Sequence, residues 1–289
     1  MLILNPIAGT KKAAKNLEEI VSLFNRADYK VQVYVTADAG DATEAVKKFG
    51  KDTDLIVCSG GDGTLSETVC GIVESDIDIP VGYIPAGSTN DFANTLRLSD
   101  DVLTAAEQII KGTPTAYDIG TCGERYFTYV ASFGLFTKAS YSTPQNIKNT
   151  LGHVAYILSG IQELSAIRVE HLNIEIDGET LEDDYLFGAV CNSLSIGGLI
   201  TLKPDMVDMS DGKFEVLFIR APKNMQELGE CIIALTTQTF DCNMITFRSG
   251  KSIRVTAKEN MTWSIDGERM DGEKQFEIKN LHQRIRVVH

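Results

Sequence analysis

Apolar positions in the first third of the chain follow two alternating spacings. Short apolar runs typical of buried strands are separated by segments with apolar residues three or four positions apart, the spacing of an amphipathic helix. The predicted strands are residues 2–4, 31–35, 54–58 and 79–84, and the predicted helices are residues 11–26, 41–49, 64–73, 90–96 and 101–111. Strands that alternate with helices predict a parallel sheet covered by helices on both faces.

The rhythm changes at about residue 114, after which strand-like runs dominate. They lie at residues 126–133, 172–176, 186–191, 214–219, 253–256, 276–278 and 285–288, with two helices expected at 152–164 and 223–236. Asp-Gly pairs, typical of hairpin turns, separate many of these runs. We predict an α/β fold followed by a mostly-β, antiparallel β-sandwich, with domains at 1–113 and 114–289, and with the last strand, near 280–289, free to return to the first domain.

Length and charge limit the number of domains and the classes of function that the chain can have. The 289 residues are enough for two domains of roughly 150 residues each or for one large domain. Lys and Arg total 27 against 40 Asp and Glu, and the resulting net charge of −13 argues against nucleic-acid binding and against a polybasic membrane anchor. Lys11, Lys12 and Lys15 form one local cationic cluster inside this acidic chain.

The first residues, the length of the apolar runs and the spacing of Cys and His indicate where the protein is located and whether it binds zinc. The first residues enter a strand pattern directly, so no signal peptide is expected. No apolar run reaches the roughly 18–20 residues of a membrane span. The six cysteines contain no C-x-x-C pair and the four histidines no H-x-x-x-H spacing, which makes a zinc site unexpected. These features predict a cytoplasmic protein with reduced cysteines.

Three glycine-containing segments each follow a predicted strand. They are residues 5–9 (Asn-Pro-Ile-Ala-Gly), 59–64 (Ser-Gly-Gly-Asp-Gly-Thr) and 85–93 (Pro-Ala-Gly-Ser-Thr-Asn-Asp-Phe-Ala). Ligands of open α/β sheets bind at the carboxyl ends of the strands, so the three segments are expected to line one cleft. Because glycine has no Cβ, its backbone N–H can approach a phosphate closely. Helices beginning at Thr64 and Asn90 would also direct their N-termini at an anion.

Asp62 is unusual in such a loop, since a carboxylate repels phosphate. Its position indicates either a cation such as Mg²⁺ between the two or a role in accepting a proton from a substrate hydroxyl. The alternative is that residues 60–64 form only a tight turn with Thr64 as a helix cap. The patterns G-x-x-x-x-G-K-[ST] and G-x-G-x-x-G are absent, so an ATP site here would use neither.

Together these segments resemble the catalytic domain of the diacylglycerol kinase family, which includes sphingosine and ceramide kinases and bacterial lipid kinases. The resemblance covers nearly the whole chain. Gly-Gly-Asp-Gly is shared with NAD kinases and the phosphofructokinase fold, whereas Asn-Asp-Phe-Ala at 90–93 favours the lipid kinases. The resemblance implies a nucleotide-binding domain of NAD-kinase/phosphofructokinase-like architecture, followed by a β-rich lipid-binding domain.

The resemblance also implies site residues. Asp62 would be the general base or part of a magnesium network, with Glu67 and Asp91 in support. The residues expected to hold ATP are Asn5, Gly9, Lys11, Gly60, Gly61, Gly63, Thr64, Glu67, Gly87, Ser88 and Asn90. Ser88 stands where the family usually has Thr, and the hydroxyl is kept.

The family places a catalytic Glu in an Asp-Gly-Glu triplet near the C-terminus. Such triplets begin here at Asp177, Asp266 and Asp271. Residues 263–268 fit the family position best, so Glu268 is the expected catalytic residue and Glu273 the runner-up. The triplet at Asp177 is expected only to turn a hairpin.

Bacterial members of the family carry a second, structural metal site just before a strand, and residues 208–214 match it. Asp208, Asp211 and the main-chain carbonyl of Lys213 would supply hard oxygen ligands suited to Mg²⁺ or Ca²⁺. The alternative is an acidic surface turn.

The expected function is ATP-dependent phosphorylation of the hydroxyl of a lipid such as diacylglycerol. The lipid substrate would be reached by peripheral contact with a membrane surface, and a homodimer is left open. Two alternatives remain. One is a soluble kinase of the NAD-kinase type, and the other is a non-catalytic lipid or nucleotide sensor of the same fold.

Overall fold

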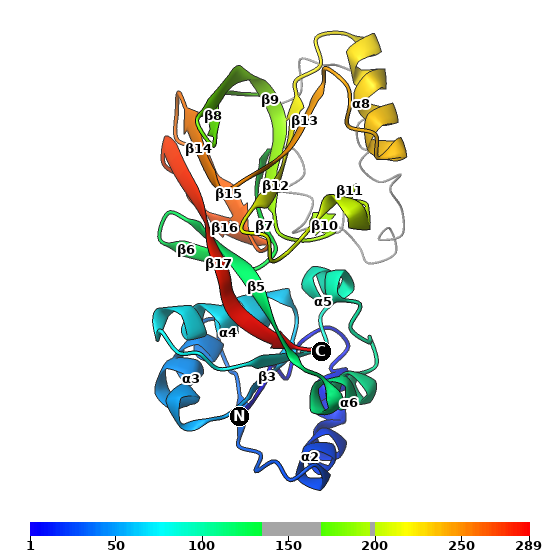
Figure 1. The fold of residues 1–289 in the computed structure, drawn as a ribbon, viewed down its shortest axis with the longest axis vertical. Coiled ribbons are helices and arrows are strands. Elements are labelled where there is room, and N and C mark those ends of the chain that lie inside the picture. Colours follow the sequence, from blue (N-terminus) through cyan, green and yellow to red (C-terminus); the bar gives the residue numbers. More distant parts are fainter. Residues whose placement is uncertain (135–168, 197–199) are drawn as a thin grey trace. The chain divides into compact units, whose positions relative to one another are not determined.

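The computed structural model describes residues 1–134, 169–196 and 200–289. The chain forms two compact units, Met1–Ile119 with His282–His289, and Gly120–Leu281 (Figure 1). The sequence had suggested a boundary at residue 113, and the helix expected at 152–164 lies outside the described residues. Within the part of the chain that the structure describes, no helix combines the length and apolarity needed to cross a bilayer.

The first unit is built on a parallel sheet in the order β2-β1-β3-β4-β17. Its strands are β1 (Leu2–Leu4), β2 (Val33–Val35), β3 (Ile56–Gly60), β4 (Val81–Pro85) and the end of β17 (Gln275–Val288). Its helices are α1 (Lys12–Lys15), α2 (Leu17–Arg26), α3 (Asp41–Phe49), the 3₁₀ turn η1 (Gly50–Asp52), α4 (Asp62–Glu74), α5 (Asp91–Leu96) and α6 (Val102–Lys111).

Helices cover both faces of this sheet, as the sequence predicted. Ile20 and Phe24 of α2 and Ile109 of α6 pack on one face, in a core shared with Leu4 of β1 and Val57 of β3. Helices α3 and α4 pack together on the other face (Figure 1). The N–H of Asn5, directly after β1, donates to the carbonyl of Ser59 in β3 at 2.9 Å, so neighbouring strands end side by side.

Two helices begin or end away from their expected positions. The continuous helix predicted over residues 11–26 is wrong, because it breaks at Asn16, whose Nδ2 donates to the carbonyl of Lys12 at 2.8 Å and ends α1. Helix α4 begins at Asp62 rather than Thr64, with Gly61 as its N-cap. Asp62 therefore belongs to the first turn of a helix and not to the loop before it.

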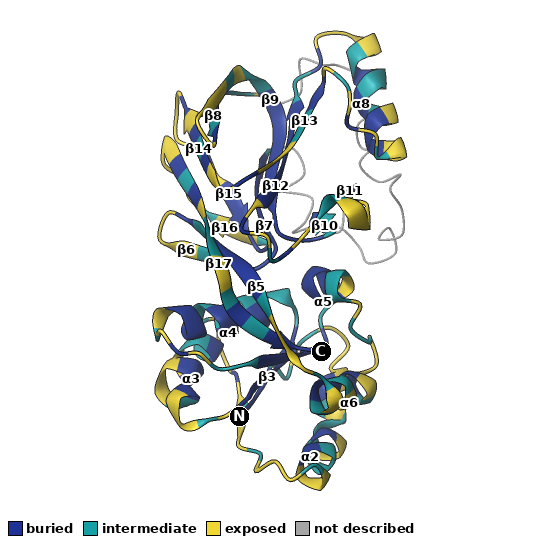
Figure 2. Ribbon diagram, in the orientation of Figure 1, coloured by how far each residue is buried: buried dark blue, intermediate teal, exposed yellow. Residues whose placement is uncertain are grey.

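The second unit is a predominantly antiparallel β-sandwich, which confirms the predicted fold class. Its strands are β5 (Pro114–Cys122, which begins in the first unit), β6 (Arg125–Phe127), β7 (Val130–Gly134), β8 (Glu170–Ile176), β9 (Glu179–Cys191), β10 (Ser195–Ile196), β11 (Ile200–Thr201), β12 (Phe214–Arg220), β13 (Ile245–Gly250), β14 (Ser252–Ala257), β15 (Trp263–Ile265), β16 (Glu268–Met270) and the first half of β17. The described helices are η5 (Pro204–Met206) and α8 (Met225–Thr237). Figure 2 shows its strands largely buried, whereas α8 presents both buried and exposed residues.

The sandwich core centres on aromatic rings. Trp263 lies 5.0 Å from Phe133 and 5.0 Å from Phe276, measured between ring centroids. The run predicted at 126–133 is two strands, β6 and β7, and the runs predicted at 276–278 and 285–288 are one continuous strand, β17. Asp177-Gly178 turns the β8–β9 hairpin as expected, with φ angles of 49° and 91°.

Candidate functional site

The three glycine segments meet at the carboxyl ends of β1, β3 and β4. A Cβ placed on Gly9 would lie 2.3 Å from the carbonyl oxygen of Ala86, and one on Gly87 would lie 2.6 Å from the Cα of Gly61. Both approaches are shorter than a side chain tolerates, so glycine is required at these two positions for the loops to pack together. Gly9 also has a φ of 51°, in the left-handed region.

Side-chain and main-chain hydrogen bonds join the same loops. Asn5 Nδ2 donates to Thr64 Oγ1 at 3.0 Å, which ties the first loop to the first turn of α4. The N–H of Ala86 donates to the carbonyl of Gly60 at 2.7 Å and ties the third loop to the second.

The N-terminus of α4 is the feature best suited to an anion. No side chain caps it, so the N–H groups of Gly63 and Thr64 have no carbonyl of a preceding helical turn to donate to. A Cβ added to Gly63 would meet no atom within 4 Å, so there is open space beside this turn. A phosphate group fits such a site by charge and by size.

Asp62 holds the third loop as well as opening α4. Its Oδ2 accepts the N–H of Asp91 at 3.1 Å and its Oδ1 accepts the N–H of Phe92 at 3.4 Å. The expectation that α5 directs its N-terminus at a bound anion needs correction, because these N–H groups are directed at the carboxylate of Asp62. Asp91 itself is 2% exposed, and because its N–H contacts the Asp62 carboxylate, the second and third loops bring two aspartates close together.

Asn90 makes the third loop rigid. It adopts a left-handed conformation with a φ of 54°, and its Oδ1 accepts the N–H of Gly87 at 3.0 Å while its Nδ2 donates to the Gly87 carbonyl at 3.2 Å. Tyr83 Oη donates to the Gly60 carbonyl at 3.3 Å. Burial, followed by the nearby Asp62 carboxylate, raises the pKa of Tyr83 well above its usual range and keeps this donor protonated. Ser88 is exposed on the same loop.

Two further expected residues lie at the edge of this arrangement. Glu67 turns toward α3, where its carboxylate accepts the N–H of Gly40 at 2.8 Å and that of Ala42 at 3.2 Å. The structure thus gives Glu67 a task in capping α3. Lys11 is exposed and has a φ of 60°.

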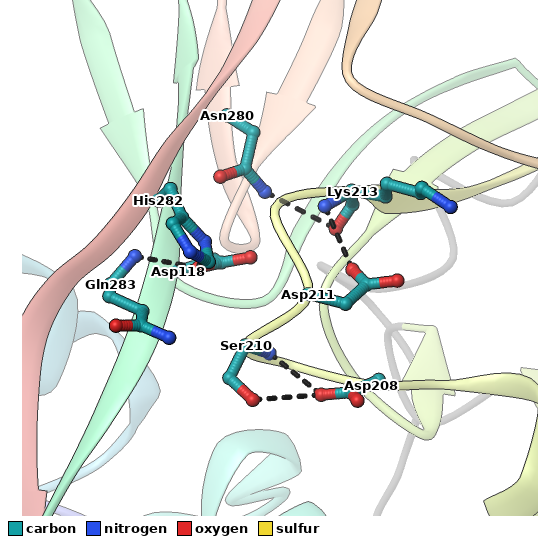
Figure 3. A network of polar contacts seen from close by, with 8 residues as sticks. All are labelled: Asp118, Asp208, Ser210, Asp211, Lys213, Asn280, His282 and Gln283. Carbon is teal, nitrogen blue, oxygen red and sulfur yellow. Dashed lines mark hydrogen bonds and ion pairs between the residues drawn. The ribbon is translucent and has the colours of Figure 1, made fainter.

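The sequence reasoning missed two polar residues of the first unit. Thr36, directly after β2, is buried, and its Oγ1 donates to the Leu4 carbonyl at 3.4 Å. Asp118 of β5 is fully buried, and its Oδ1 accepts His282 Nδ1 at 3.0 Å and the N–H of Gln283 at 2.7 Å (Figure 3). No strand was predicted over residues 114–122, where β5 lies, so nothing in the sequence analysis marked Asp118 for burial.

In the second unit, Glu268 lies at the start of β16. Its side chain is 61% exposed, and its Oε2 lies 3.9 Å from Arg125 Nη1. Asp266 of the same triplet is 5% exposed and turns the β15–β16 hairpin with a φ of 46°. Its carboxylate accepts the N–H groups of residues 128, 129 and 130. Asp266, to which the sequence analysis gave no role, therefore fixes the hairpin that carries Glu268.

The loop expected to bind a structural metal is shown in Figure 3. Asp208 Oδ1 accepts the N–H and hydroxyl of Ser210, and Asp211 Oδ1 accepts the N–H of Lys213 at 2.8 Å. The carbonyl of Lys213 accepts Asn280 Nδ2 at 3.2 Å. The described residues contain no cluster of three or more His, Cys, Asp or Glu side chains able to hold a metal. Two exposed carboxylates and one carbonyl are nevertheless hard oxygen donors of the kind that Mg²⁺ and Ca²⁺ prefer.

Comparison with known proteins covers both units. Residues 1–122 match a family described as the diacylglycerol kinase catalytic domain, and residues 130–288 match one described as the YegS C-terminal NAD kinase beta sandwich-like domain. The chain is 32% identical to a diacylglycerol kinase of Bacillus subtilis, over 99% of this chain and 95% of that protein. It is also 32% identical to a diacylglycerol kinase of Staphylococcus saprophyticus, over 99% and 93%.

Solved structures show the same fold. A Bacillus anthracis protein provisionally described as a diacylglycerol kinase superposes with a TM-score of 0.82 at 26% identity, covering 100% of this chain and 94% of that one. A second structure, of a diacylglycerol kinase from the same organism, has a TM-score of 0.78 at 24% identity, covering 100% and 95%.

Proposed function

Because the chain belongs to the diacylglycerol kinase family, we propose that it is an ATP-dependent lipid kinase that phosphorylates the hydroxyl of a lipid such as diacylglycerol. The observation that carries the proposal is the meeting of three glycine loops beside Asp62, at an uncapped helix N-terminus. Full-length similarity to named diacylglycerol kinases supports the same activity.

The residues present fit a nucleotide phosphate. First-turn N–H groups of α4 and the open side of Gly63 would hold it, and Asn5 and Asn90 keep the surrounding loops in place through their hydrogen bonds. ATP supplies the phosphoryl group, and a divalent cation, proposed as Mg²⁺, neutralises its charge. Positioning and charge neutralisation are the main contributions of a kinase to this reaction.

Asp62 is the proposed general base. It is partly exposed, and its two N–H contacts with residues 91 and 92 fix the direction of its carboxylate. In this role it accepts the proton of the lipid hydroxyl at a carboxylate oxygen as the phosphoryl group is transferred. Asp91, buried beside it, adds negative charge that suits a divalent cation.

We also propose roles for residues of the second unit and a location for the enzyme in the cell. Glu268 is assigned to catalysis on its triplet position, and Asp208, Asp211 and Lys213 to a structural Mg²⁺ or Ca²⁺ on their donor chemistry. We place the enzyme in the cytoplasm, in peripheral contact with the membrane that holds its substrate, with a part in phospholipid metabolism.

The test is a labelled-ATP assay on purified protein with a panel of lipid alcohols in mixed micelles and NAD as a control acceptor. We expect phosphorylation of a lipid and none of NAD. Asp62→Asn should lower turnover about 100-fold or more, the range for loss of a general base, whereas Asp76→Asn, at a carboxylate that is 94% exposed, should leave it unchanged.

Outcomes separate the alternatives. Transfer of labelled phosphate to NAD alone identifies a soluble NAD-kinase-like enzyme. If no acceptor is phosphorylated, the result favours a non-catalytic sensor. Normal turnover by folded Asp62→Asn refutes the role given to Asp62. Circular dichroism of each variant shows whether the fold is intact.

A further inference from the structure

A buried tyrosine hydroxyl contacts two of the three glycine loops. Tyr83 lies on β4, is 1% exposed and is among the largest side chains that the fold buries completely. Its Oη donates to the Gly60 carbonyl at 3.3 Å and to Asn90 Oδ1 at 3.4 Å. One hydroxyl thus joins the second glycine loop to the third.

Packing alone does not account for this hydroxyl. A phenylalanine at position 83 would fill the same space with its ring, and a polar group taken out of water costs free energy unless it is hydrogen-bonded. Both distances exceed the value of about 2.7–2.8 Å that is typical of O–H···O hydrogen bonds, so the single proton is shared between two acceptors. A shared proton adds little stability, but it fixes the two acceptors relative to each other.

Both acceptors keep another donor if the hydroxyl is removed. The Gly60 carbonyl also accepts the N–H of Ala86 at 2.7 Å, and Asn90 Oδ1 also accepts the N–H of Gly87 at 3.0 Å. Loss of the hydroxyl therefore leaves neither acceptor without a hydrogen bond, and it should cost little stability. An effect of this loss on turnover can then be told apart from unfolding.

The two acceptors lie next to the groups that hold Asp62. Gly60 stands two residues before Asp62, and Asn90 is the N-cap of α5. The N–H groups of residues 91 and 92, the first two of α5, donate to the Asp62 carboxylate at 3.1 Å and 3.4 Å. A shift of Gly60 relative to Asn90 would therefore move the Asp62 carboxylate relative to its donors.

The hydroxyl is close enough to the acidic pair to interact with it electrostatically. Burial, followed by the carboxylate of Asp62 and less strongly by that of Asp91, raises the pKa of Tyr83 well above its usual range. The hydroxyl therefore stays protonated and remains a donor at any ordinary assay pH.

We propose that Tyr83 is a positioning residue for phosphoryl transfer, whose hydroxyl holds Gly60 and Asn90 at the spacing that directs the Asp62 carboxylate. Its role rests on the proposed function, in which Asp62 accepts the proton of the lipid hydroxyl. A misdirected general base slows the transfer step and leaves the binding of substrates unchanged, so the loss should appear in kcat. ATP affinity should persist, because the hydrogen bond between Asn5 and Thr64 also holds the first turn of α4.

The test variant is Tyr83→Phe, which removes only the hydroxyl. Its matched control is Tyr185→Phe, at a tyrosine buried in the core of the second unit. In the labelled-ATP assay, Tyr83→Phe should lower kcat about tenfold, within the roughly 100-fold that a misplacement of about 1 Å can cost, with the KM for ATP unchanged. The control should keep the kcat of the parent. Parent kcat in Tyr83→Phe, or an equal loss in the control, overturns the proposal.

A double-mutant cycle separates positioning of Asp62 from a general loosening of the fold. In a protein that already has Asp62→Asn, no base is left to direct, so adding Tyr83→Phe should lower kcat by less than about twofold, as expected for coupled residues. If Tyr83→Phe lowers kcat by the same factor with Asp62 and with Asn at this position, its role is only structural and the proposal is wrong.

Amide hydrogen exchange followed by NMR tests the geometry without any substrate. Loss of the Tyr83 hydroxyl should speed exchange of the N–H groups of Asp91 and Phe92 at least about fivefold, because their hydrogen bonds to Asp62 open more often. Exchange within α2, whose N–H groups bond inside their own helix, should stay the same. Unchanged exchange at residues 91 and 92 overturns the proposal. If these two amides respond but the parent protein phosphorylates no lipid, the proposed function is refuted and the part that Tyr83 plays in holding Asp62 is upheld.

Discussion

Replacing Asp266 with Ala should destabilise the second unit more than most single substitutions do. The carboxylate of Asp266 accepts the N–H of Thr128 at 2.7 Å, its hydroxyl at 2.9 Å, and the N–H groups of Tyr129 and Val130 at 3.1 Å each. All three donor residues are 5% exposed or less. The substitution therefore leaves three main-chain donors buried without this acceptor.

The magnitude follows from those donors. A buried polar group left without a partner costs about 1–3 kcal/mol, so three of them suggest a loss of about 4 kcal/mol or more. That is a large share of the roughly 5–15 kcal/mol by which domains are stable. Asp266→Asn, which keeps one oxygen, should have an intermediate effect.

Asp177 offers a matched control. It occupies the same place in an Asp-Gly-Glu triplet, and its φ of 49° is close to the 46° of Asp266, so Ala meets the same backbone penalty at both sites. Its carboxylate accepts the N–H groups of Lys251 and Ser252, but the residue is exposed and water can replace it. Asp177→Ala should cost about 1–2 kcal/mol, most of it backbone strain.

The assay is urea unfolding followed by tryptophan fluorescence. The chain has one tryptophan, Trp263, which is 1% exposed on β15 of the same hairpin, so its emission reports on this unit. Far-UV circular dichroism checks that the transition is cooperative. If Asp266→Ala and Asp177→Ala unfold at the same urea concentration with equal slopes, the carboxylate of Asp266 does not have the structural weight assigned to it.

Two further predictions concern the glycine loops and a surface histidine. Gly87→Ala should lower the thermal unfolding midpoint, because its Cβ would lie 2.6 Å from Gly61 Cα. Gly63→Ala should not lower the midpoint, because its Cβ meets no atom within 4 Å and Ala favours a helix over Gly, but it should weaken ATP binding. Equal midpoints for both variants would contradict the packing argument. His171 lies between Asp184 at 2.7 Å and Glu182 at 3.1 Å, and these hydrogen bonds raise its pKa above the usual value of about 6.5. The protonated His171 therefore stabilises the folded protein fully below the pKa that His171 has in the unfolded chain, and this stabilisation is lost as pH rises through its pKa in the folded chain. The difference in stability between the parent and His171→Gln should grow as pH falls. An NMR titration that gives His171 an ordinary pKa would refute this.

The order of elements in the first unit could be predicted because local spacing decides it. Strand β1 and helix α3 begin and end where the apolar spacing placed them. The break at Asn16 could not be predicted from spacing, since it depends on a side chain bonding to the backbone four residues earlier. Strand β17 was divided in two because its middle, around His282 and Gln283, is polar.

The meeting of the glycine loops was also predictable, since parallel neighbouring strands end at one edge of a sheet. The partners of the acidic side chains were not. The Asp62 carboxylate accepts a hydrogen bond from α5, and the Glu67 carboxylate accepts one from the start of α3. Both hydrogen bonds depend on how separate helices pack against each other. Asp118 was missed for the same reason, because its partners lie more than 160 residues away.

Two of the Asp-Gly-Glu triplets differ in burial although their sequences are the same. Asp177 and Asp266 have the same neighbours in sequence and nearly the same backbone angles, yet one is exposed and the other buried. The difference lies in residues 128–130, whose N–H groups are directed at Asp266 from a distant part of the chain. If Glu268 takes part in catalysis, its position depends on this anchor two residues earlier. Loss of activity in an Asp266 variant would then arise from displacement of Glu268, and Glu268→Gln in a hairpin of normal stability is the variant that separates chemistry from position.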